Sequence, residues 1–258
     1  MTAGDGAAVI DQFRIDGRLA VVTGASRGLG RGCALALAGA GADVAVISRN
    51  QDDLEPVAAE IRALGRKAYI LALDVTAIDA FAAKLGELPP LDIFVNNAGT
   101  NRPQPFLDVD PDTFDAVMEV NLRGAFFAAQ AAARRMAAAG RGGSIVNMSS
   151  QAGHRALRDR SVYCVSKFAL EGLTKTMAYE LADQNIRVNA VAPTFVETEL
   201  TKPVLARKDF RDYVEGKIRL PRLGQIDDVA AAVLYLASPA SAMVTGTSLL
   251  VDGGWTIH

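Results

Sequence analysis

The 258-residue sequence lacks several features that would point to particular classes of protein. It has only two cysteines, Cys33 and Cys164, which lie far apart and outside any metal-site spacing, so we expect buried thiols in a reducing cytoplasm. The net charge of −2 and the absence of a basic stripe give nucleic-acid binding no support. No run reaches the roughly 18 apolar residues of a membrane span, and no signal peptide is recognisable. We therefore expect a cytoplasmic protein that acts on a small molecule, with no nucleic-acid, membrane or metal partner.

Short apolar runs alternate with helical stretches along most of the chain. Apolar runs that stop at glycine or polar residues are typical of strands buried on both faces of a sheet. Right-handed crossovers then give a single-domain α/β Rossmann fold, with a seven-stranded, doubly wound parallel sheet and helices on both faces. We expect a flexible tail over 1–12 and one catalytic domain over 13–258. The expected strands are 19–23, 43–48, 67–73, 91–95, 143–148, 186–191 and 248–251, and the main helices are 28–40, 52–64, 78–85, 111–138, 161–183 and 227–237.

A glycine-rich turn follows the first expected strand. Its sequence is Thr23-Gly24-Ala25-Ser26-Arg27-Gly28-Leu29-Gly30. Glycines in this place let the backbone turn tightly and approach a pyrophosphate, whose charge meets a helix N-terminus. The spacing is G-x-x-x-G-x-G rather than G-x-G-x-x-G, and an ordinary glycine-rich turn is the alternative. The position between a strand and a helix favours dinucleotide binding by Gly24, Ser26, Arg27, Gly28, Leu29 and Gly30.

The end of the second expected strand bears on the choice of cofactor. Chains that prefer NAD usually place a carboxylate there, whereas this chain has Ser48-Arg49-Asn50. Asp43 lies at the other end of the strand, roughly 16 Å away. Arg49 and Arg27 could clasp a 2′-phosphate, with two simply solvated arginines as the alternative. The sequence favours NADP(H) over NAD(H).

Polar and small residues also follow the third and fourth strands. A carboxylate at Asp74-Val75 could accept a hydrogen bond from an adenine amino group. The small residues of Asn97-Ala98-Gly99 would let the adenosine half of a cofactor lie close. Each of these short motifs alone is no stronger a signal than an ordinary turn.

Tyr163 and Lys167 are four residues apart on one expected helix, and this spacing places both side chains on the same face. An ammonium beside the ring favours the phenolate and predicts a lowered tyrosine pKa, which suits proton exchange with an alcohol or ketone. A packed ring beside a solvated lysine is the alternative. Ser150, after the fifth strand, could converge with Tyr163 on one substrate oxygen. Asn121 falls inside a helix, where a structural role is the alternative to a functional one.

Taken together, these positions resemble the short-chain dehydrogenase/reductase family, from Phe13 to the C-terminus. The resemblance implies that Ser150 polarises the substrate oxygen and that Tyr163 is the acid/base. It also implies that Lys167 binds the nicotinamide ribose and lowers the tyrosine pKa, and that Asn121 anchors a water linking Lys167 to solvent. The motifs that carry the resemblance are the glycine turn, Asn96-Asn97-Ala98-Gly99, Asn121, Ser150, Tyr163-x-x-x-Lys167 and Asp252-Gly253-Gly254.

The same resemblance assigns further parts of the chain. Family members bind the nicotinamide amide through the segment after the sixth strand, which implies roles here for Pro193, Thr194, Val196 and Thr198. Thr194 departs from the glycine usual after this proline, which affects the expected loop shape and substrate pose. A variable substrate lid over about 199–218 and a homotetramer, paired through two long helices and the last strand, are also implied.

The substrate is less sharply indicated. The chain is similar to family members that act on sugar acids and polyols, and the lid is mixed rather than apolar. We therefore expect a small polyhydroxylated or acidic substrate of a secondary alcohol–ketone reaction. The candidate contacts are Arg102, Ser150, Gln151, His154 and Tyr163, although His154 alone is more typical of a loop hydrogen-bonder. The alternatives are a 3-oxoacyl-type or general carbonyl reductase, a non-catalytic dinucleotide sensor and a scaffold subunit.

Overall fold

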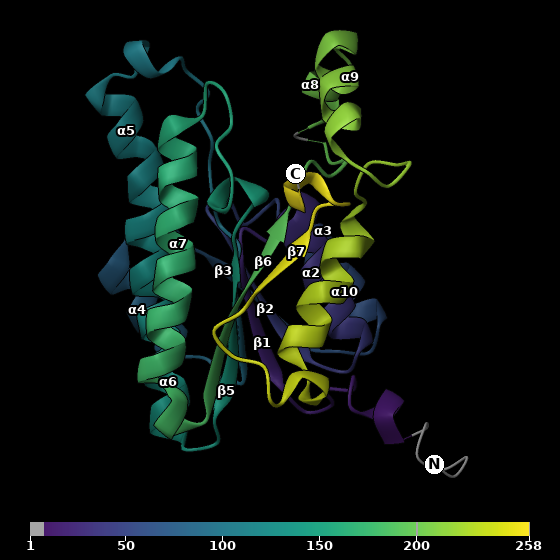
Figure 1. Cartoon of the computed structure of the whole chain (residues 1–258). Coiled ribbons are helices and arrows are strands. Elements are labelled where there is room, and N and C mark those ends of the chain that lie inside the picture. Colours follow the sequence, from purple (N-terminus) through teal and green to yellow (C-terminus); the bar gives the residue numbers. More distant parts are fainter. Residues whose placement is uncertain (1–7, 200, 258) are drawn as a thin grey trace.

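In the computed structural model, which describes residues 8–199 and 201–257, a central parallel sheet lies between two layers of helices (Figure 1). The strand order is β3-β2-β1-β4-β5-β6-β7, and every neighbouring pair is parallel. This order confirms the expected doubly wound sheet. The strands are β1 Leu19–Thr23, β2 Asp43–Ser48, β3 Ala68–Ala72, β4 Ile93–Asn96, β5 Gly143–Met148, β6 Ile186–Pro193 and β7 Ser248–Val251.

The helices bury one hydrophobic core on each face of the sheet. Neighbouring side chains of a strand point to opposite faces, so Val22 belongs to one core and Val21 to the other. One face is covered by α2 (Gly28–Gly39), α3 (Glu55–Ala63) and α10 (Ile226–Ala237), and the other by α4 (Ile78–Gly86), α5 (Pro111–Met118), α6 (Ala125–Ala139) and α7 (Ser161–Glu180). The short helices α8 (Lys202–Leu205) and α9 (Lys208–Lys217) stand beyond one end of the sheet, inside the expected lid (Figure 1).

The helix expected over 111–138 is divided by a wider turn. Asp110 caps its start by accepting a hydrogen bond from the Thr113 backbone N–H at 2.7 Å, and Pro111 fits the first turn. The π-helical segment Glu119–Gly124 then separates α5 from α6. Such a segment holds one extra residue in its turn, and it rotates the next helix about the axis relative to a continuous α-helix. Asn121 is buried there, at 1% exposure.

Other boundaries differ from the expected ones by a few residues. The helix expected from residue 52 begins at Glu55, because residues 51–54 first form a turn in which the Leu54 N–H donates to the Gln51 carbonyl. Strand β6 continues to Pro193 because it pairs with β7 over its last four residues. Pairing with a neighbouring strand therefore sets the strand ends, which apolar runs alone do not define.

The chain at Gln12 and Phe13 contacts α10 and the turn that follows it. Residues 8–11 form one turn of helix, whereas the sequence predicts a loose tail over 1–12; residues 1–7 lie outside the described chain. The Gln12 carbonyl accepts a hydrogen bond from the Ala240 N–H, and the Phe13 ring lies 6.3 Å from that of Tyr235. Of the helices in the described part of the chain, none is long and apolar enough to cross a membrane.

Candidate active site

A cavity of about 760 Å³ opens at the carboxyl ends of the strands. This is the edge at which doubly wound sheets bind their ligands. The sequence motifs that follow separate strands meet there, as expected for parallel strands. The predicted residues that line the cavity are Gly24, Ser26, Arg27, Gly28, Leu29, Gly30, Ser48, Arg49, Asp74, Val75, Asn97, Ala98, Gly99, Arg102, Ser150, Gln151, Tyr163, Lys167, Pro193, Thr194, Val196 and Thr198.

The glycine turn has a conformation that side chains would obstruct. Gly24 and Gly28 have φ values of 63° and 55°, in the left-handed region that favours glycine. A Cβ at Gly30 would lie 2.1 Å from the Gly24 carbonyl oxygen. The turn also leads into the N-terminus of α2, where unpaired N–H groups favour an anion. These features fit the diphosphate of a dinucleotide.

Residues from β1 and β4 hold this turn in place. The side chain of Asn97 donates to the carbonyl oxygens of Thr23 and Gly24, at 2.9 and 3.2 Å. In return, the buried Thr23 hydroxyl accepts from the N–H groups of Asn97 and Ala98, both at 2.9 Å. The structural role of Thr23 was missed in the sequence, where the only signal was a hydroxyl residue at the end of a buried strand.

At the tip of β2, Ser48 and the exposed Arg49 line the cavity together with Arg27, whereas Asn50 does not. The side chain of Asn50 instead accepts a hydrogen bond from the Asp52 N–H at 3.1 Å. This bond stabilises the turn before α3, and cofactor binding by Asn50 stays a prediction. Asp74, at the end of β3, lines the cavity and accepts from both the N–H and the hydroxyl of Thr76.

Ser150, Tyr163 and Lys167 all line the cavity. The Lys167 Nζ lies 5.6 Å from the centre of the Tyr163 ring and donates a hydrogen bond to the Met148 carbonyl at 2.7 Å. The Ser150 hydroxyl donates to Gln151 Oε1 at 3.0 Å and accepts from the Ala152 N–H at 3.1 Å. A hydroxyl, a phenol and an ammonium are thus brought together from β5 and α7.

Burial perturbs both titratable groups of this site. It raises the pKa of Tyr163, and the Ser150 hydroxyl opposes the change by stabilising the phenolate. The expectation of a lowered tyrosine pKa is therefore wrong for the protein by itself, because removal of the phenol from water dominates. Burial also lowers the pKa of Lys167 to about 8, with the negative charge of Glu171 acting in the opposite direction.

Asn121 lies behind the cavity rather than on its wall. Its side-chain amide donates to the Thr100 carbonyl at 2.8 Å and to the Ser166 hydroxyl at 3.1 Å, and its Oδ1 accepts from the Thr100 N–H at 2.7 Å. These bonds fix the segment after Gly99 against α7. The contacts agree with the structural role considered for Asn121, and the water-anchoring role stays a prediction.

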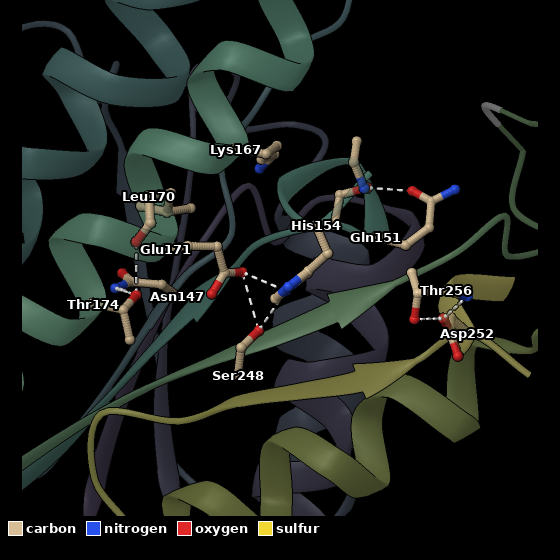
Figure 2. Close-up of polar contacts among 12 residues, drawn as sticks. Asn147, Gln151, His154, Lys167, Leu170, Glu171, Thr174, Ser248, Asp252 and Thr256 are labelled. Carbon is tan, nitrogen blue, oxygen red and sulfur yellow. Dashed lines mark hydrogen bonds and ion pairs between the residues drawn. The ribbon is translucent and has the colours of Figure 1, made fainter. Parts of the chain in front are cut away.

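The predicted substrate contacts separate into two groups. Arg102 and Gln151 line the cavity, but His154 does not. The His154 Nε2 lies 3.0 Å from the Ser248 hydroxyl and 3.2 Å from Glu171 Oε1, on the other side of the loop from the Gln151 side chain (Figure 2). These contacts agree with the alternative of a loop hydrogen-bonder, because the loop turns the ring toward β7, and the role of His154 as a substrate contact stays a prediction.

A cation lies against two aromatic rings at one end of the cavity. The guanidinium of Arg160 lies 5.9 Å from the centre of the Phe195 ring and 5.7 Å from that of Phe210, and all three residues line the cavity. These rings join a small cluster with Trp255. In the sequence, Arg160 is one of several cations between Ser150 and Tyr163 that could bind an anionic group of the substrate, whereas its contacts with these rings were not predicted.

Comparison with known proteins agrees with this geometry. The profile of a family described as "Enoyl-(Acyl carrier protein) reductase" matches residues 24–256. D-erythrulose reductase of Gallus gallus is 42% identical over 241 residues, which are 93% of this chain and 96% of that protein. A short-chain type dehydrogenase/reductase from Mycobacterium marinum has a TM-score of 0.92 at 43% identity and covers 97% of this chain and 100% of its own.

A gluconate 5-dehydrogenase from Burkholderia cenocepacia J2315, solved with NADP and tartrate, also has a TM-score of 0.92. It is 37% identical and covers 97% of this chain and 99% of its own. The similarity thus extends over the whole sheet and the residues at its carboxyl edge. The chain belongs to the short-chain dehydrogenase/reductase family and is an oxidoreductase that acts on CH–OH groups.

Proposed function

We propose that the protein interconverts a secondary alcohol and a ketone, with NADP(H) as cofactor and a small polyhydroxylated compound as substrate. The observation that carries the proposal is the meeting of Ser150, Tyr163 and Lys167 in a cavity that continues to the glycine turn. A proton-transfer site and a phosphate cradle in one cavity are what such a reaction requires.

The cavity wall fits a nicotinamide dinucleotide. The glycine turn would hold the diphosphate, and Arg27 with Arg49 would hold a 2′-phosphate. Lys167 would bind the nicotinamide ribose, and Val196 with the Thr198 side chain the amide. NADP is bound in the related gluconate 5-dehydrogenase, which supports the preference for NADP(H). When bound, the cofactor accepts or supplies the hydride, and its oxidised ring adds a positive charge beside the phenol.

Residues of the chain would transfer the proton between the substrate oxygen and Tyr163. In the oxidation direction, the Ser150 hydroxyl orients the substrate oxygen and the Tyr163 phenolate takes its proton; reduction reverses these steps. An ammonium about 6 Å away stabilises a phenolate by about 3 kcal/mol at an effective dielectric constant near 20. This is worth about two pKa units, so Lys167, whose Nζ lies 5.6 Å from the ring centre, would add to the Ser150 hydroxyl in offsetting the burial of Tyr163.

The variant Tyr163→Phe tests the acid/base role. It should fold, bind NADPH in a fluorescence titration and lose nearly all turnover, because the proton acceptor is missing. The matched control is Tyr179→Phe, the same change at an exposed position on the same helix. Substantial turnover by Tyr163→Phe would refute the assignment. Cofactor binding by the wild type without turnover of any hydroxylated substrate would instead favour the sensor alternative.

The cofactor preference depends on Arg27 and Arg49. We expect Arg49→Ala to weaken NADPH binding by about 10-fold or more and to leave NADH binding nearly unchanged, because one charge-assisted phosphate contact is lost. Arg62→Ala is the control, since this exposed arginine belongs to α3 and does not line the cavity. Equal loss for both cofactors would contradict the 2′-phosphate role.

The polar lining favours a substrate with several hydroxyls. Gln151 Nε2 and the Thr194 hydroxyl are buried and have no hydrogen-bond partner among the described residues, although both side chains line the cavity. Buried polar groups normally have a partner, and rotation of either side chain toward the cavity would let a hydroxyl of the substrate provide one. The names of two relatives, D-erythrulose reductase and gluconate 5-dehydrogenase, agree with this substrate class.

Two other substrate classes follow from specific contacts. Arg102 and Arg160 could bind the carboxylate of a sugar acid. The apolar lining by Leu157, Phe195 and Phe210 favours a 3-oxoacyl group as the second candidate. Turnover assays with polyols, sugar acids and 3-oxoacyl thioesters separate these classes. We expect Gln151→Ala to raise KM for a polyol more than for a simple secondary alcohol.

We also propose that the protein is a homotetramer. Large apolar side chains are exposed on α6 and α7, namely those of Phe126, Val165 and Phe168. A second copy of the chain would cover them. Sedimentation velocity tests this assembly, and a monomer at micromolar concentration would contradict it.

A further inference from the structure

A polar cluster, made of the buried Glu171, the half-buried Ser248 and the exposed His154, lies outside the cavity (Figure 2). The Ser248 hydroxyl donates to Glu171 Oε1 at 3.0 Å, and the His154 Nε2 lies 3.2 Å from the same oxygen and 3.0 Å from the hydroxyl. The hydrogen bond of the ring is with the Ser248 hydroxyl, and the same nitrogen lies within ion-pair distance of the carboxylate. The cluster therefore surrounds one carboxylate with a hydroxyl donor from β7 and a ring nitrogen from the loop.

The carboxylate belongs to the helix of the active site. Glu171 follows Lys167 by one turn of α7, so the two side chains share a face. Both are buried, at 8% and 4% exposure. The Lys167 ammonium forms no ion pair within 4 Å in the described part of the chain, and its one hydrogen bond goes to the Met148 carbonyl. A buried ammonium without a close counter-ion depends on charges at longer range.

The loop after Ser150 packs directly on this turn of the helix. A Cβ at Gly153 would lie 3.0 Å from the Lys167 carbonyl oxygen and 3.1 Å from Glu171 Cγ. The close approach of the 3-10 segment η3 (Gln151–Gly153) therefore excludes solvent from the space beside these two residues. Charges interact more strongly in such surroundings than at an exposed surface.

We infer that Glu171 is a positioning residue of the active site, whose carboxylate, held by His154 and Ser248, keeps the Lys167 ammonium charged beside Tyr163. The inference rests on the proposed function of Tyr163 and Lys167. Burial favours the neutral amine, and Glu171 is the group that opposes this loss of charge. Lys167 is faced by Tyr163 and Glu171 on its own helix and by the Met148 carbonyl of β5; Tyr163 is in turn faced by Ser150, Cys164 and Arg160.

The test compares Glu171→Gln with Glu180→Gln, the same substitution at an exposed position on the same helix. Trace acetylation of the cofactor-free protein, followed by mass spectrometry, reports the pH midpoint at which Lys167 becomes reactive. Loss of the nearby negative charge should lower this midpoint by about one pH unit. The alkaline limb of the kcat/KM profile should move by the same amount. Glu180→Gln should leave both unchanged.

An unchanged Lys167 midpoint in folded Glu171→Gln overturns the inference. Should that variant fail to fold, Ser248→Ala gives the second measurement, because it releases the carboxylate and should lower the midpoint by a smaller amount. A wild-type midpoint in Ser248→Ala then counts against the inference. Failure of the proposed function would be seen separately, as turnover by Tyr163→Phe, and would leave the labelling result intact.

Discussion

Replacement of Lys167 by methionine should stabilise the fold while abolishing activity. Burial lowers the pKa of Lys167 from its ordinary value of 10.5 to about 8, so the folded protein holds this proton less tightly than the unfolded chain does. Near pH 7 the charged lysine therefore costs about 3 kcal/mol of folding free energy. Removal of the charged group in Lys167→Met should therefore stabilise the fold, and loss of the hydrogen bond to the Met148 carbonyl offsets about 1 kcal/mol of this gain.

The dependence on pH distinguishes this effect from a general change in packing. Between about pH 8 and 10.5 the folded protein has released the proton and the unfolded chain still holds it, so the stability of the wild type rises with pH. The cost falls to about 1 kcal/mol near pH 10, and the advantage of Lys167→Met should shrink by about 2–3 kcal/mol over this interval. Urea denaturation at several pH values measures this difference. Lys175→Met, an exposed position on α7, is the control. A difference independent of pH would refute the reasoning.

Three further predictions concern the glycine turn, a buried ion pair and a thiol. Gly30→Ala should abolish cofactor binding in a fluorescence titration, because its Cβ would lie 2.1 Å from the Gly24 carbonyl oxygen. Gly39→Ala is the control on the same helix: its Cβ would meet open space, so the free energy of unfolding should rise by about 0.5–1 kcal/mol. Asp92→Asn should lower the free energy of unfolding by about 2 kcal/mol, because this buried carboxylate binds Arg18 and Arg141, at 3.0 and 2.8 Å; a loss under 0.5 kcal/mol would contradict this. Burial raises the pKa of Cys33 to about 12, so a thiol reagent at pH 8 should label it only after unfolding, and rapid labelling of the native protein would disprove its burial.

The sheet and the position of the candidate site could be predicted because both depend on the order of elements along the chain. Strands buried on both faces are continuous apolar runs, and parallel strands bring their carboxyl ends to one edge. The residues after β1, β4 and β5 therefore had to share a site, whatever the details of packing. Gly30, Ser150 and Tyr163 all line one cavity for this reason.

The side-chain directions in loops could not be predicted in the same way. His154 and Arg160 lie in one segment between β5 and α7, and both are polar and near Ser150 in sequence. The structure turns His154 toward Ser248 and brings Arg160 to the cavity beside Phe195, because partners distant in sequence decide each direction. The raised pKa of Tyr163 was missed for a related reason: the depth of burial depends on the packing of the whole domain.

The widened turn between α5 and α6 gives this helix a spare residue. Removal of one residue within Glu119–Gly124 could be absorbed by tightening the segment to ordinary α-helical winding, with both flanking helices kept in place. The change would carry Asn121 about 100° around the axis and away from Thr100 and Ser166. The number of residues in this helix therefore sets the direction in which the Asn121 amide points. A helix shorter by one residue could retain the fold and lose the hydrogen bonds that join the segment after Gly99 to α7.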